Sequence, residues 1–248
     1  IYSGASTAGD PSLTVDAAGN VLAGFSTSTG AWASRFEPSV GWNDPTIIDN
    51  ERNHPSTPQM AAMPNGEAWA VWHQPPNGLQ YYIFANRFDP STGWGEAATV
   101  DTETLYNSFD PKVAVAPNGN ALVVWRQTVG LGSRVWASAW DEAEGVLSEP
   151  EQLGTPADAY APAVAINPDG LGFATWTRSG SELAVMIAKY TAEDGWSNAE
   201  VLAEGDLKSD ARVAMDDNGN AVVVYALKAP YESLSDAYAQ IFTAGSWG

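Results

Sequence analysis

Pro111-Lys-Val-Ala-Val-Ala-Pro-Asn-Gly119-Asn-Ala-Leu-Val-Val-Trp125 is the stretch that decides the fold of this 248-residue chain. A short apolar run is followed by an Asn-Gly pair and by a second apolar run that ends in an aromatic residue. Asn before Gly supplies the positive φ angles of a tight hairpin. The two runs are therefore predicted to be strands that fold directly onto each other.

The same pattern occurs five times along the chain, as Pro11–Phe25, Pro58–Trp72, Pro111–Trp125, Pro162–Trp176 and Ala211–Tyr225. The turn glycines Gly19, Gly66, Gly119, Gly170 and Gly219 follow one another at intervals of 47, 53, 51 and 49 residues. A constant period of about 50 residues indicates a repeat architecture, in which each copy buries its apolar surface against its neighbours.

Each copy continues with two more predicted strands. The third strand is predicted at Ala31–Phe36, Ile83–Phe88, Val135–Trp140, Met186–Tyr190 and Tyr238–Phe242. A turn that contains Gly-Trp follows, and then a fourth strand at Thr46–Ile48, Ala98–Val100, Glu151–Leu153 and Glu200–Leu202. Four antiparallel strands per copy without a helical pattern predict an all-β fold, a five-bladed β-propeller that forms a single domain over residues 1–248.

The two ends of the chain complement each other. The fifth copy stops at Trp247-Gly248, where its fourth strand should begin, and the chain opens with Ile1-Tyr2 before the first proline. We expect the N-terminal strand to pair with the last blade and close the ring. The alternative is an open fragment of a longer repeat array. A first residue other than methionine suggests a processed secreted protein or an excised domain.

The units resemble the repeats of secreted bacterial β-propeller proteins, whose consensus runs Pro-x-Val-Ala, Gly-Asn-Ala, Val-Trp-x-Gln, Trp-Ala-Asn-Arg-Phe and Gly-Trp. The second copy matches best, with Trp72-His-Gln74, Ala85-Asn-Arg-Phe88 and Gly93-Trp94. The resemblance covers the whole chain and implies a secreted or cell-surface location. In blade number and repeat length the chain is also similar to the five-bladed tachylectin-like lectins, which implies carbohydrate binding between blades.

Composition excludes several classes of partner. Thirty acidic and eleven basic residues give a formal net charge of −19, which repels nucleic acid and anionic lipid. The longest apolar runs, such as Ala221 to Leu227, are far shorter than the roughly 18 residues of a membrane-spanning helix, so no membrane insertion is expected. The chain has no cysteine, and disulfides, thiolate chemistry and sulfur-ligated zinc are therefore excluded.

The variable loops between strands two and three, and between strand four and the next copy, meet on one face. Loops on a rigid scaffold are where binding residues usually lie, so the ligand is expected on this loop face. Amide, imidazole and guanidinium groups next to aromatic rings suit the hydroxyls and C–H faces of sugars. The predicted ligand-binding residues are His73, Gln74, Tyr106, Arg126, Gln127, Tyr160 and Arg178. The alternative is that each polar group caps a loop carbonyl or bridges two blades.

Three carboxylates recur directly before strand one, in the first, third and fifth copies: Asp10, Asp110 and Asp210. If the first strands line a central channel, these carboxylates meet at its mouth and could hold a hard cation such as Ca²⁺. Otherwise each accepts hydrogen bonds from its own loop. No other cofactor is expected. The repeated tryptophans, for example Trp72 and Trp125, are expected to lie in the core.

The function predicted from these features is a non-catalytic extracellular module that binds a glycan or another cell-surface partner. A structural unit of a surface adhesin or extracellular filament is the alternative. A glycoside hydrolase is the last alternative, and an enzyme is not expected, because a glycosidase needs two carboxylates in unlike environments. In this sequence the acids before strand one are either repeated or replaced, by Thr57 and Ala161.

Overall fold

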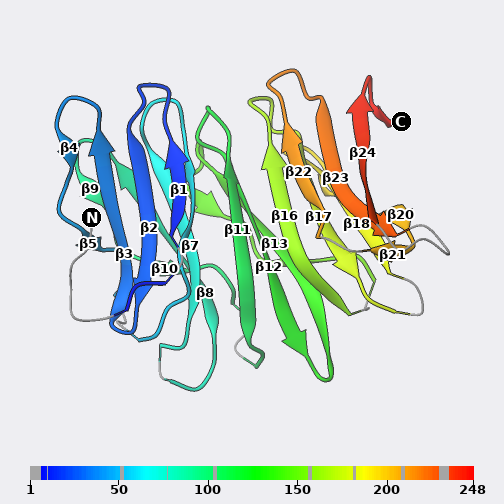
Figure 1. Ribbon diagram of the computed structural model, residues 1–248, viewed down its shortest axis with the longest axis horizontal. Coiled ribbons are helices and arrows are strands. Elements are labelled where there is room, and N and C mark those ends of the chain that lie inside the picture. Colours follow the sequence, from blue (N-terminus) through cyan, green and yellow to red (C-terminus); the bar gives the residue numbers. More distant parts are fainter. Residues whose placement is uncertain are drawn as a thin grey trace. The chain divides into compact units, whose positions relative to one another are not determined.

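The computed structural model describes residues 7–9, 11–50, 53–76, 78–102, 105–155, 158–180, 183–207, 210–228 and 235–248 (Figure 1). Within these ranges the chain forms strands and turns and no helix, which confirms the all-β prediction. The chain divides into two compact units, Ile1–Gly119 and Asn120–Gly248, each described by itself below.

The first unit begins with two antiparallel sheets. The first sheet contains β1 (Ser12–Val15), β2 (Val21–Thr27), β3 (Gly30–Glu37), β4 (Gly41–Trp42) and β5 (Thr46–Ile47). The second contains β6 (Gln59–Ala62), β7 (Ala68–Gln74), β8 (Tyr82–Asp89), β9 (Gly93–Trp94) and β10 (Ala98–Thr99). Strands β1 and β6 are neighbours, because the Ala62 amide donates to Thr14 Oγ1 at 2.9 Å. The first two sheets therefore meet along their first strands.

Two more sheets repeat this strand order, and the fifth differs. The third contains β11 (Ser108–Val115), β12 (Ala121–Val129), β13 (Gly132–Asp141), β14 (Val146–Leu147) and β15 (Glu151–Leu153). The fourth contains β16 (Ala159–Ile166), β17 (Gly172–Arg178), β18 (Ala184–Thr191), β19 (Gly195–Trp196) and β20 (Glu200–Glu204). The fifth contains β21 (Asp206–Leu207), β22 (Arg212–Met215), β23 (Ala221–Lys228), β24 (Ser235–Thr243) and β25 (Ser246–Trp247). It differs because β21 and β22 both pair with its long strand β23.

Five antiparallel sheets of this type fit five blades. Closure of the ring through Ile1-Tyr2 concerns residues outside the described ranges and stays a prediction, as does the single domain. The predicted hairpins are confirmed: Val21 pairs with Val15 across the Gly19 turn, and Gly172 pairs with Ile166 across the Gly170 turn.

The Gly-Trp segments differ from the prediction. They are short strands rather than turns, and β4 and β5 both pair with β3, so the fourth strand of the blade is broken in two. The third sheet has the same break between β14 and β15, where Val146 and Leu147 stand in place of Gly-Trp. In the first and second sheets the tryptophan ring packs on the aromatic residue near the end of the third strand. The ring centroids lie 5.4 Å apart for Phe36 and Trp42 and 5.3 Å apart for Phe88 and Trp94.

The core lies on the second strands. The side chains of Trp72 and Trp125 are completely buried, and Trp176 is 3% exposed. In the first unit the ring of Trp72 stacks on Phe84 with centroids 6.2 Å apart. The prediction that these repeated tryptophans belong to the core is confirmed.

Candidate functional site

A hollow of about 300 Å³ lies in the first unit where β6 and β11 begin and β7 ends. We call it the His73 hollow. Its lining consists of Pro11, Ser56, Thr57, Gln59, His73, Asp110, Pro111 and Lys112. It lies on the loop face, where the sequence predicts the ligand, and it brings together two of the predicted site residues, His73 and Asp110.

The imidazole of His73 is held by its neighbours. Its ring makes edge contacts with Phe109 and Tyr81, at centroid distances of 5.2 Å and 5.6 Å. The backbone amide of His73 donates to Ser56 Oγ at 3.0 Å. Packing of this kind fixes the direction in which a half-buried imidazole faces the hollow.

Asp110 has an unusual backbone. Its φ angle is +55°, in the left-handed region that residues other than glycine rarely adopt. The residue also precedes Pro111, which restricts it further. The equivalent residue of the fourth sheet, Ala161, has φ +54° and lies at a register shift of β16. Strands β11 and β16 both begin before their proline, at Ser108 and Ala159. The side chain of Asp110 is exposed.

Lys112 adds a positive charge to the hollow. Its Nζ donates to Gln59 Oε1 at 3.1 Å, which positions the ammonium group between β6 and β11. A carboxylate, an imidazole and an ammonium group thus line one hollow, and these are the side chains that exchange protons in general acid–base chemistry. Sequence reasoning missed Lys112 and Gln59. The sequence does contain a signal for these two residues. The first residue of strand one differs in every copy, whereas the Val-Ala pair that follows it occurs in three of them.

Two of the predicted ligand residues lie in the core. Gln74 is completely buried and Gln127 is 1% exposed. The Oε1 atom of Gln74 accepts a hydrogen bond from the indole of Trp72. Gln74 therefore satisfies the indole of Trp72 inside the sheet, and its side chain does not reach the loop face.

The remaining predicted residues occupy separate places. Arg126 donates from Nη1 to Ser133 Oγ at 3.2 Å, and Arg178 forms an ion pair with Glu204 at 3.0 Å. Tyr160 is 37% exposed, and burial together with the charges of Asp210 and Asp158 raises the pKa of its hydroxyl. Tyr106 is half-buried and does not line the His73 hollow.

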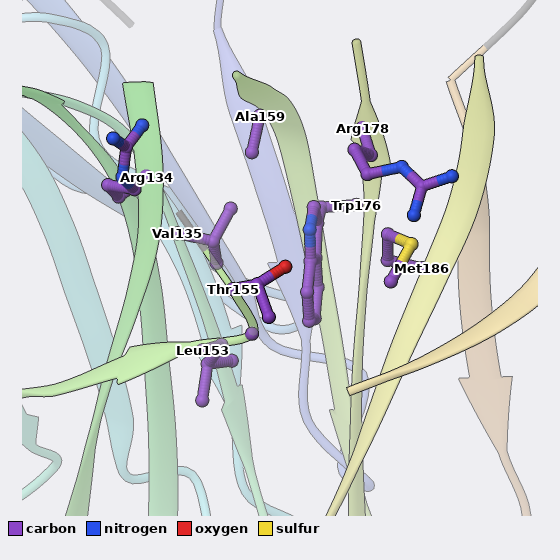
Figure 2. A pocket seen from close by; sticks show the side chains of 9 residues that line it. Arg134, Val135, Leu153, Thr155, Ala159, Trp176, Arg178 and Met186 are labelled. Atoms are coloured by element: carbon purple, nitrogen blue, oxygen red, sulfur yellow. The ribbon is translucent and has the colours of Figure 1, made fainter. Parts of the chain in front are cut away.

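A second pocket, in the second unit, is too small for a sugar. Figure 2 shows Trp176 between Val135 and Thr155 on one side and Met186 on the other, with Arg134 and Arg178 in the upper part of the view. The free volume is about 10 Å³, enough for about one water molecule.

The proposed cation site stays a prediction. Asp10 lies outside the described residues, and Asp110 and Asp210 belong to different units. Asp210 is exposed and lies 3.9 Å from Arg212. Within the described ranges no three His, Asp or Glu side chains are grouped as metal ligands, and no helix there is long and apolar enough to cross a membrane.

Comparison with family models and with curated proteins gave no match, whereas solved structures with a similar fold were found. A protein of unknown function from Dyadobacter fermentans is 13% identical, with a TM-score of 0.64 over 94% of this chain and 76% of its own. A polysaccharide lyase, ulvan lyase, is 8% identical, with a TM-score of 0.62 over 95% of this chain and 64% of its own. The α-L-arabinanase of Penicillium chrysogenum, complexed with arabinobiose, is 13% identical, with a TM-score of 0.58 over 96% and 79%.

These neighbours overturn the prediction that the chain is not an enzyme. Enzymes that cleave glycans share its fold over almost its whole length, so the fold gives no ground for excluding catalysis. The argument from repeated acids also fails. Asp110 differs from Asp210 in its surroundings, because Asp110 shares its hollow with His73 and Lys112, whereas Asp210 lies 3.9 Å from Arg212. Equivalent positions in the sequence are therefore unequal in the structure.

Proposed function

We propose that the chain binds a glycan in the His73 hollow and cleaves it there, with His73 and Asp110 as the acid–base groups. The observation that carries the proposal is the grouping of Asp110, His73 and Lys112 around one hollow. The left-handed backbone recurs at Ala161 and therefore belongs to the repeat, whereas the three charged or ionisable side chains meet at this place. The glycan-cleaving neighbours and the resemblance to secreted proteins support a carbohydrate substrate met outside the cell.

The charges of the hollow favour an acidic sugar and an elimination reaction. Hydrolysis by two carboxylates requires a pair of Asp or Glu residues, and Asp110 is the one carboxylate among the described residues of the lining. In elimination, a base removes the proton beside the carboxyl group of a uronic acid. The glycosidic C–O bond then breaks, a C=C bond forms, and the leaving oxygen takes up a proton. Lys112 would pair with the sugar carboxylate and stabilise the charge that develops on it.

Three variants of the hollow test the proposal. Asp110→Asn and His73→Ala should each lower kcat by about 10²- to 10⁴-fold, the usual contribution of an acid–base group. Lys112→Ala should mainly raise KM for a uronate-containing polysaccharide. Asn tolerates the left-handed backbone as Asp does, so the Asp110→Asn protein should fold normally. Arg178→Ala, in the other unit, is the matched control and should keep full activity.

The assay separates the two reactions. The ultraviolet absorbance of the unsaturated product reports elimination, and reducing ends without that absorbance report hydrolysis. Substrates are a uronate-containing polysaccharide, an arabinan and a polymer of amino sugars. Full turnover by both Asp110→Asn and His73→Ala would contradict the proposed site. Glycan binding that depends on the hollow, without cleavage of any substrate, would contradict the proposed reaction.

A further inference from the structure

The second unit carries another hollow, of about 330 Å³, where β13 and β18 end. It lies at the hairpin-turn end of these strands, whereas the predicted site residues follow the other end of the sheets. We call it the Ala139 hollow. The residues that matter for its chemistry are Asn120, Ala139, Trp140, Asp141, Glu144 and Tyr190.

The equivalent place in the first unit is filled by an arginine. Cζ of Arg35 lies 5.7 Å from the ring centroid of Phe88, so the guanidinium covers the aromatic face. Nη1 of Arg35 also forms an ion pair of 2.9 Å with Glu37. A cation, an aromatic ring of the next sheet and a carboxylate of its own sheet thus fill the space between the first two sheets.

Strand register shows what replaces them in the second unit. Trp32 pairs with Phe25 and Trp136 with Trp125, so Ala139 occupies the position of Arg35, and Asp141 that of Glu37. Tyr190 pairs with Gly172 as Phe88 pairs with Ala68, so it occupies the position of Phe88. The aromatic ring and the carboxylate are therefore kept, and the arginine is replaced by alanine. The five copies carry Arg35, Arg87, Ala139, Lys189 and Ile241 at this position.

The carboxylate of Asp141 is held next to the ring. Its Oδ1 accepts hydrogen bonds from the amides of Ala143, at 2.8 Å, and Glu144, at 3.1 Å. Burial, and to a smaller extent the charge of Asp141, raises the pKa of the Tyr190 hydroxyl. The indole of Trp140 donates to Glu142 at 2.8 Å, which fixes a second aromatic wall.

We propose that the Ala139 hollow binds the guanidinium group of an arginine side chain presented by a peptide. The guanidinium lies on the face of Tyr190 and pairs with Asp141, as Arg35 does with Phe88 and Glu37 in the first unit. The alanine methyl leaves the space that the incoming side chain needs. This site is independent of the glycan site, because it lies in the other unit and at the turn end of the strands.

Calorimetric titration with the peptide acetyl-Gly-Arg-Gly-amide tests the proposal, with the neutral citrulline peptide as the matched ligand. The arginine peptide should bind, and the citrulline peptide should bind at least about tenfold more weakly because it lacks the charge. Ala139→Arg should abolish binding by filling the hollow from within. Asp141→Asn should weaken binding about tenfold while its amide oxygen keeps the turn. Asp89→Asn, at the equivalent position of the second sheet, should leave binding unchanged.

Three results would overturn the proposal. They are equal binding of the arginine and citrulline peptides, unchanged binding by Asp141→Asn, and binding of glucosamine without binding of the arginine peptide. Asp141→Asn decides the matter if Ala139→Arg does not fold, since Asn replaces Asp in the turn without added volume.

Discussion

Buried carboxylates hold the start of the third strands. Asp49 accepts a hydrogen bond from the amide of Ala31 at 2.8 Å, and Asp101 accepts one from Ile83 at 2.9 Å. Asp101 is 4% exposed, and this burial raises its pKa from 3.8 to about 6, although hydrogen bonds from Ser108 and Ile83 act in the opposite direction. A group that closes a loop therefore makes the stability of the protein depend on pH.

We predict that Asp101→Asn removes one component of this pH dependence. The folded protein binds the proton more tightly than the unfolded chain, so the contribution of Asp101 is complete below pH 3.8 and is lost as the pH rises through about 6. A shift of this size corresponds to about 3 kcal/mol. The unfolding free energy of Asp101→Asn minus that of the unmodified protein should therefore increase by about 3 kcal/mol as the pH rises from about 3.5 to about 8. Urea titrations across this range measure the gain.

Asp89→Asn is the control for that experiment. Hydrogen bonds from Ser91 lower the pKa of Asp89, so its contribution is present at neutral pH and is lost on acidification. The stability difference between this variant and the unmodified protein should therefore change with pH in the opposite direction. Parallel curves for the unmodified protein and Asp101→Asn would disprove the role of Asp101.

Gly172, the first residue of β17, lies against Leu122 of β12. A Cβ atom at this position would overlap Leu122 Cδ1 and would lie 3.2 Å from the carbonyl oxygen of Ala165. The other copies have alanine or valine here, and Leu122 is completely buried, so the leucine has little room to move. The missing side chain at Gly172 thus leaves the space that Leu122 of the preceding sheet occupies.

We predict that Gly172→Ala lowers the unfolding free energy by about 1–3 kcal/mol through overpacking. Leu122→Ala alone should cost about 2–5 kcal/mol because it leaves a cavity. The double variant should be more stable than the sum of the two losses implies, because the added methyl group at residue 172 fills part of the cavity that Leu122→Ala leaves. Urea titration of the four proteins gives the coupling energy. Strict additivity would show that the two residues do not compete for the same space.

Much of the strand pattern could be predicted from the sequence because hairpins are local. The Asn-Gly pair at Gly119 and the doubly apolar strand that ends at Trp125 determine their own neighbours. The broken fourth strand could not be predicted, because its segments, such as β4 and β5, are two residues long and too short to show a pattern of their own. Pro111 suggested the start of a strand, whereas β11 begins earlier, at Ser108, and has Asp110 in a left-handed conformation.

The candidate sites were harder to predict because they depend on differences between copies. His73 was expected on the loop face, and its partners Lys112 and Gln59 come from the first strands of two sheets. The glutamines were misplaced because sequence alone does not show that Gln74 turns inward to Trp72. Ala139 carries no chemical signal of its own. Its meaning appears only when the structure shows Arg35 filling the equivalent space.

At the scale of the whole molecule, the net charge of −19 predicts that salt stabilises the protein. Eleven basic residues cannot pair with thirty acidic ones, so the folded state carries repulsion that ions screen within about 10 Å at 0.1 M. Raising NaCl from about 20 mM to about 500 mM should raise Tm by a few degrees, as about 1 kcal/mol does for a chain of this size. KCl at equal ionic strength should act equally if screening is the cause.

CaCl₂ at the same ionic strength tests the cation site expected at Asp10, Asp110 and Asp210, because a bound ion adds to Tm in proportion to its occupancy. An increase beyond that of NaCl that disappears in Asp110→Asn would establish the site, and a Tm that falls with NaCl would show that repulsion between carboxylates does not limit the stability of this fold.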